Sequence, residues 1–165
     1  MANTKKFLAL CFFRSNPQDI TVNYQLFQLV LMRYALVSIL VQGTLIGYGR
    51  AMIHTGVEAV LTILFIGIVM MIARKTQWFL QTITAIMASE SMIALLCLPL
   101  AFWLSTAEKG INLIPFYSIV FLVLWALSVV GYILKKVLLK DVQWGFSLTC
   151  LYFFGSFVST AFVMH

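Results

Sequence analysis

Three ionisable side chains, Arg33, Glu58 and Glu90, lie inside long apolar stretches of the chain. A charge at the centre of a bilayer costs at least about 2.5–3.5 kcal/mol, so each group must be paired, neutral or in contact with water. Two interpretations of Glu90 stay open. It is either a carboxyl group that carries a proton or a cation, or a neutral or Arg33-paired group that joins two helices. For Arg33, extension toward the lipid headgroups is the alternative to an ion pair with Glu90.

A second polar group is formed by His54 and Glu58, which are four residues apart, with Thr62 one turn further on. Side chains at this spacing meet on one face of a helix. We expect a solvated helix end near the outer surface. A transition-metal site would need His165 as well, and nothing in the sequence places it nearby, so no metal site is predicted.

The sequence offers no recognisable catalytic constellation. It has no Walker motif, no GxGxxG, no HExxH and no Ser/His/Asp set, and its three cysteines are far apart. We therefore expect a protein that is not an enzyme, with no catalytic residues and no cofactor.

The elements that must hold these residues follow from the composition, which is 62% hydrophobic and only 10% charged. Soluble domains carry about 25% charged residues, so a soluble enzyme and a nucleic-acid-binding protein are excluded. We predict an all-α integral membrane protein, a five-helix transmembrane bundle with a short interfacial N-terminal segment. Residues 1–25 form that segment and residues 26–165 form the transmembrane domain. The five predicted spans are Leu26 to Tyr48, Met52 to Ala73, Trp78 to Leu104, Ile114 to Leu134 and Trp144 to Val163.

The N-terminal segment contains a short apolar run, Phe7 to Phe13, between Lys6 and Arg14. Seven residues are too few to cross a bilayer. The run either lies on the membrane surface or packs against the bundle, and the sequence does not separate the two. Residues Asn16 to Asp19 then predict the start of a helix, because Asn caps helices and Pro17 suits the first turn.

Basic residues alternate between the connections. Three lie in the N-terminal segment, two in the second connection and three in the fourth, whereas the other side holds only Arg50 and Lys109. Lys and Arg prefer cytoplasmic loops. We predict a bacterial inner-membrane protein with its N-terminus in the cytoplasm and its C-terminus outside.

Small residues four apart mark faces on which helices can pack closely. Gly43 and Gly47 form such a pair in the first span, and Gly155 and Ser159 form another in the fifth. These faces serve packing within the chain or between copies.

The layout resembles the Yip family of five-span membrane proteins and its small bacterial relatives. The similarity rests on the amphipathic N-terminus, the helix start Asn16-Pro17-Gln18-Asp19, and a third span running from Phe79-Leu80-Gln81-Thr82 to Leu98-Pro99. The resemblance implies the fold and a membrane location. The long cytosolic region that the family's eukaryotic members have, and their small-GTPase partners, are not implied for this chain.

The functional prediction is a non-enzymatic scaffold or assembly factor that acts by helix–helix association. Its expected partners are the lipid bilayer and either further copies of the chain or other membrane proteins, with no nucleic acid. The alternative is a small transporter or a proton or ion pathway centred on Glu90 and Arg33.

Overall fold

The computed structural model describes residues 2–14, 17, 22–106, 113–138, 147–155 and 158. Within these ranges all regular structure is helical, and no strand occurs. The elements are α1 (Ala2–Cys11), α2 (Tyr24–Ile46), α3 (Tyr48–Ile72), the short 3₁₀ helix η2 (Thr76–Trp78), α4 (Phe79–Thr106) and α5 (Leu113–Leu138). Residues 147–155 form a further helical segment, called the C-terminal segment below.

Four of these helices are long and apolar enough to cross a membrane: α2, α3, α4 with the preceding η2, and α5. Their ends agree with the first four predicted spans to within four residues. The fifth predicted span, Trp144 to Val163, lies partly outside the described residues. Its described part is helical, and its crossing of the membrane stays a prediction.

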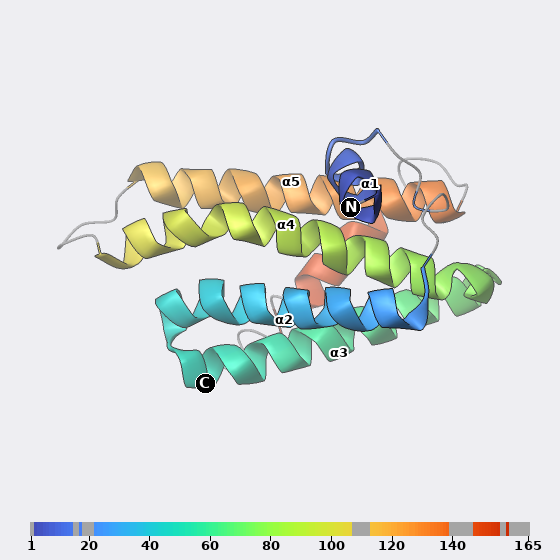
Figure 1. Cartoon of the computed structure of the whole chain (residues 1–165), viewed down its shortest axis with the longest axis horizontal. Coiled ribbons are helices and arrows are strands. Elements are labelled where there is room, and N and C mark those ends of the chain that lie inside the picture. Colours follow the sequence, from blue (N-terminus) through green and yellow to red (C-terminus); the bar gives the residue numbers. More distant parts are fainter. Residues whose placement is uncertain are drawn as a thin grey trace.

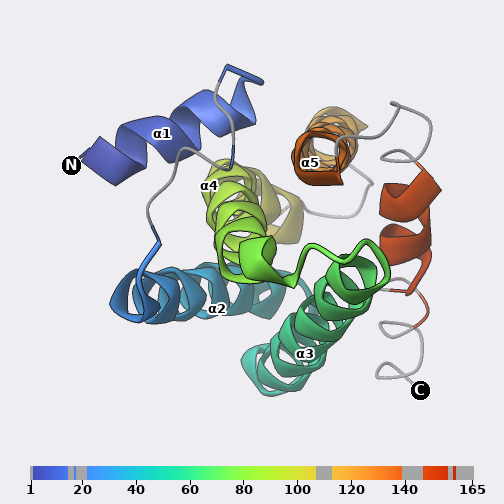
Figure 2. The same cartoon turned by 90° about the vertical axis from the view of Figure 1, so that its right-hand side faces the viewer.

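Helix α4 lies at the centre of the bundle, in contact with α1, α2, α3 and α5 (Figures 1 and 2). Half of its apolar stretch is buried inside the protein, against 22–28% for the other three long helices. The α4 sequence suits this position because Ala85, Ala88 and Ala101 let neighbouring helices approach closely. The hydroxyls of Thr82 and Thr84 donate to carbonyls one turn back, so these polar groups need no partner outside α4.

Helices α2 and α3 form an antiparallel pair joined by one residue (Figure 1). The side chain of Asn23 caps the start of α2 by accepting a hydrogen bond from the Leu26 amide at 2.8 Å. Gly47 ends the helix with φ of +87°, a conformation that residues with a Cβ avoid. This glycine permits the chain to reverse direction within a single residue.

Two of the basic clusters lie at the same end of the bundle. Lys75, in the connection between α3 and α4, donates a hydrogen bond to the carbonyl of Val137 at 2.8 Å. Val137 lies in the last turn of α5, next to Lys135 and Lys136. The basic residues of the second connection and of the last turn of α5 therefore lie close together.

Helix α1 runs across the long helices and packs on α4 and α5 (Figure 2). Phe7, Leu10 and Cys11 are buried there, and the Trp125 indole donates a hydrogen bond to the Cys11 carbonyl at 3.0 Å. The rings of Phe12 and Trp125 are 5.5 Å apart. Packing against the bundle, one of the two expectations for this segment, is thus what the described residues show, and a position at the membrane surface stays a prediction. Of the expected helix start at Asn16 to Asp19, all but Pro17 lies outside the described residues.

Candidate functional site

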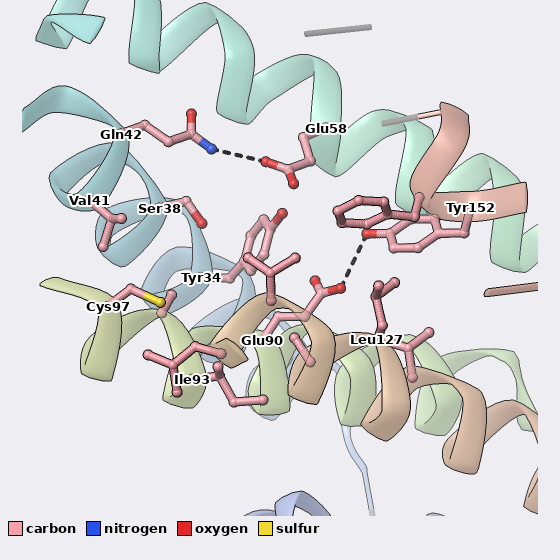
Figure 3. A pocket seen from close by; sticks show the side chains of 16 residues that line it. Tyr34, Ser38, Val41, Gln42, Glu58, Glu90, Ile93, Cys97, Leu127 and Tyr152 are labelled. Atoms are coloured by element: carbon pink, nitrogen blue, oxygen red, sulfur yellow. Dashed lines mark hydrogen bonds between the residues drawn. The ribbon is translucent and has the colours of Figure 1, made fainter. Parts of the chain in front are cut away.

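A cavity of about 200 Å³ lies inside the bundle, between α2, α3, α4, α5 and the C-terminal segment. Glu58 reaches it from α3 and Glu90 from α4, on opposite sides (Figure 3). Helices α3 and α4 start at opposite ends of the bundle (Figure 1). Glu58 is ten residues from the start of α3 and Glu90 eleven from the start of α4, hence about 15–17 Å along each helix. The two carboxyl groups therefore meet near mid-depth.

Glu58 is held by polar side chains of α2 and α3. Its Oε2 accepts a hydrogen bond from the amide nitrogen of Gln42 at 3.1 Å and lies 3.8 Å from Nδ1 of His54. Tyr34 interacts with it as well, and its ring lies between the two carboxyl groups in Figure 3. About 23% of the Glu58 side chain stays accessible. The carboxyl group is thus held by side chains of two helices.

The amide of Gln42 connects these groups. While its nitrogen donates to Glu58, its oxygen lies 2.9 Å from Nδ1 of His54 and accepts from the Thr55 hydroxyl at 3.4 Å. An amide oxygen only accepts, so Nδ1 of His54 carries a proton in this arrangement. His54 is only 8% exposed. The expectation of a solvated helix end was therefore wrong, because Gln42 of the neighbouring helix supplies the polar partner that water would have supplied.

Glu90 is joined to α3 through two hydroxyl groups. The Tyr152 hydroxyl donates to Oε1 of Glu90 at 3.2 Å and lies 2.9 Å from Oγ1 of Thr62. Thr62 in turn donates to the Glu58 carbonyl at 2.8 Å. These three contacts have only the hydroxyl protons of Tyr152 and Thr62 between them. While Glu90 is ionised, the contact between the two hydroxyl groups therefore has no proton to share. A proton on Glu90 completes the chain, because the carboxyl group then donates to Tyr152 and Tyr152 to Thr62.

Arg33 does not belong to this cavity. Its neighbour Tyr34 lines the cavity, whereas Arg33 is half-buried on a different side of α2 and interacts electrostatically with Cys11 of α1. Consecutive residues of an α-helix point about 100° apart, so the two cannot face the same way. Within the described part of the chain no salt bridge joins Arg33 to Glu90, so the ion pair, one of the two alternatives for Arg33, is not formed there, and Glu90 accepts a hydrogen bond from Tyr152.

The residues predicted to mediate helix packing have different environments. Gly43 is buried and faces the Tyr48 ring, where an added Cβ would lie 2.4 Å from Cδ1. Gly47 lies in the turn, not in a packing face, because its positive φ ends α2. Gly155 has open space around it, and Ser159 lies outside the described residues. The small residues one, two and three turns along from Glu90 do face protein: Ala94 and Cys97 line the cavity and Ala101 is fully buried.

Four polar cavity residues were missed at the level of sequence: Tyr34, Ser38, Gln42 and Tyr152. Gln42 carried a usable signal, since an amide inside an apolar span needs a partner just as a carboxyl group does. Tyr34 and Tyr152 carried none, because aromatic residues are common in membrane helices and only the packing shows which hydroxyls point inward.

The described residues contain no group of three or more His, Cys, Asp or Glu that could hold a metal ion. Ser38 and Cys97 line the cavity and are nucleophile types. In the part of the chain that the structure describes, neither is hydrogen-bonded to a histidine or a carboxyl group, as an activated nucleophile would be.

Comparison with protein-family models, with curated proteins and with solved structures finds no match to this chain. The resemblance to the Yip family therefore stays a prediction.

Proposed function

We propose that this chain is an integral membrane protein that transfers protons or a small cation across the bilayer by way of Glu58 and Glu90. The observation that carries the proposal is that two carboxyl groups from different helices face one cavity at mid-depth in the bundle. Charged groups at this depth are costly and mark ion or proton pathways in membrane proteins. The pathway is the alternative that the sequence left open, with Glu58 in the place of Arg33.

The groups around the two carboxyls support proton transfer. His54 and Gln42 lie beside Glu58, and Tyr152 and Thr62 connect Glu90 to the backbone carbonyl of Glu58. Proton relays in membrane proteins are built from such chains of carboxyl, imidazole and hydroxyl groups. No catalytic step is part of this proposal.

The proposed orientation has five spans, the N-terminus in the cytoplasm and the C-terminus outside, in the inner membrane of a bacterium. Its support is the single basic end of the bundle, which the Lys75–Val137 hydrogen bond ties together. Reporter tags on the two ends of the chain test this orientation, and both tags in one compartment would contradict it.

The pathway is tested with the purified full chain in proteoliposomes that contain a pH-sensitive dye. An imposed potential should drive proton entry for the native chain and not for Glu90→Gln or Glu58→Gln. Asp141→Asn is the matched control, because it removes a carboxyl group outside the predicted spans. Circular dichroism and size exclusion must show that the variants fold. Equal proton entry in the native chain and both folded variants would refute the proposal.

A scaffold acting by helix association is the second candidate function. Its support is the space around Gly56 of α3 and Gly155 of the C-terminal segment, both exposed and without a neighbour within 4 Å of an added Cβ. Such sites let a helix of another protein approach closely. Replacing both with Ile should abolish crosslinked complexes in native membranes, and an unchanged crosslinking pattern would argue against this function.

A further inference from the structure

The cavity beside Glu58 and Glu90 is larger than a proton pathway requires. Its volume is about 200 Å³. A cavity of about 150 Å³ in another protein is enough to hold benzene, so this one has room for a ligand with a ring-sized body. A hydrogen-bonded chain through side chains and single waters would need far less space.

Part of the cavity lining is acidic. The two carboxyl groups of Glu58 and Glu90 face it, together with the hydroxyl-bearing side chain of Ser38. The described residues that line the cavity include no Lys, Arg or His, and His54 reaches Glu58 from behind, next to Gln42. A cationic occupant would pair with these carboxyl groups in their ionised form, because unpaired charges in a low-dielectric interior are strongly unfavourable.

The part of the cavity lining that α5 contributes is apolar. Helix α5 contributes only hydrocarbon side chains to it, among them Leu122, Ala126 and Val130. The rings of Tyr34 and Tyr152 lie next to the carboxyl groups, with the Tyr34 ring between them (Figure 3). Aromatic faces next to a cation site add cation–π attraction. A hydrated metal ion gains nothing from such a wall, because it is bound by oxygen ligands all round.

We propose that this cavity binds a lipophilic primary ammonium ion, with its charged head between Glu58 and Glu90 and a ring-sized apolar body against α5. The ligand class rests on the proposed function, since it names the cation that the two carboxyl groups would take. A primary ammonium has three N–H donors, which suit two carboxyl groups and a hydroxyl. A quaternary ammonium has none to offer.

Binding is tested by titration calorimetry on the full chain in detergent near neutral pH, with benzylammonium as the probe and benzyl alcohol as the neutral analogue. Benzylammonium should bind and benzyl alcohol should not. Glu90→Gln should weaken benzylammonium binding by about tenfold or more, because a charge-assisted hydrogen bond is lost. Equal binding of both probes, or unchanged binding to the folded variant, would overturn the proposal.

A second variant fills the apolar side without touching a carboxyl group. Ala126→Phe should abolish benzylammonium binding, because the added ring occupies the space next to α5. Ser128→Phe is its matched control, because Ser128 is exposed on another face of α5 and its variant should bind benzylammonium like the native chain. Persistent benzylammonium binding to Ala126→Phe would overturn the assignment of the apolar body to α5.

The same proteoliposomes separate the two proposals. Proton entry that depends on Glu90, with no benzylammonium binding, would refute the ammonium ligand and leave the pathway standing. Glu90-dependent binding without any proton entry or amine uptake would support the ligand site and refute transport.

Discussion

The hydroxyl of Tyr152 links Glu90 to Thr62 across the cavity, at 3.2 Å from the Glu90 carboxyl group and 2.9 Å from the Thr62 hydroxyl. Tyr152 comes from the C-terminal segment, whereas Thr62 and Glu90 come from α3 and α4. One phenol group therefore connects three elements, and Tyr152 is the only tyrosine in residues 147–155. Its removal tests packing and proton transfer together.

Tyr152→Phe keeps the ring and deletes this hydroxyl. We expect the stability to fall by about 1–3 kcal/mol, because a buried carboxyl oxygen and a threonine hydroxyl each lose a partner. Potential-driven proton entry should slow several-fold, since the chain between Glu90 and Thr62 is broken. Thermal unfolding and the proteoliposome assay measure the two effects.

The matched control is Tyr24→Phe, because Tyr24 is 66% exposed at the start of α2. It should behave as the native chain does in both assays. A Tyr152→Phe protein with native stability and native proton entry would show that the hydroxyl chain is incidental.

Gln42→Leu tests the group that joins Glu58 to His54. The variant leaves both partners without the amide, at a cost of about 1–3 kcal/mol in stability. The double variant Gln42→Leu with Glu58→Leu should be less destabilised than the sum of the two single variants, because partners removed together leave no unpaired charge. Gln28→Leu, on an exposed face of α2, is the control and should not lose stability. Additive losses in denaturant unfolding would mean that Gln42 and Glu58 are not coupled.

The sequence was sufficient for the helices and insufficient for the contacts between them. Apolar length alone located α2 to α5, because a membrane helix needs about twenty apolar residues wherever it packs. Small residues next to Glu90 indicated that it faces protein, and Ala94 and Ala101 confirm this. The partner of Glu90 could not be predicted from the sequence. Tyr152 is 62 residues away, and its hydroxyl reaches Glu90 only through the packing of the C-terminal segment.

Arg33 and Gly47 show two further limits. Arg33 is the only Lys or Arg inside a predicted span and was therefore a candidate partner for Glu90, but its angular position on α2 turns it toward α1. Gly47 fits a packing pattern in the sequence, and only its φ of +87° shows that it is needed in a turn. Both depend on rotation or backbone angle, which residue spacing alone does not determine.

Gly47→Ala tests this turn. A Cβ at φ of +87° is strained, and we expect a loss of about 1–3 kcal/mol in stability. Gly56→Ala is the matched comparison, because Gly56 lies inside α3 with open space around it and the change should stabilise by about 0.5–1 kcal/mol. Unfolding in denaturant should thus move in opposite directions for the two variants. A shift in the same direction would contradict the different roles given to these glycines.

Trp125→Phe tests the docking of α1 through the hydrogen bond to the Cys11 carbonyl. Cys11 is 3% exposed, and burial raises the pKa of its thiol, so in the folded protein it should react slowly with maleimide at neutral pH. Loss of the indole donor leaves the ring contact with Phe12 weakened and should speed Cys11 labelling several-fold. The rate is measured in a background without Cys97 and Cys150, and the exposed Cys150 alone gives the rate for an accessible thiol.

Trp103→Phe, at an exposed position on α4, is the control and should leave Cys11 labelling unchanged. If Trp125→Phe also left it unchanged, α1 would be held by its buried Phe7 and Leu10 and not by the indole.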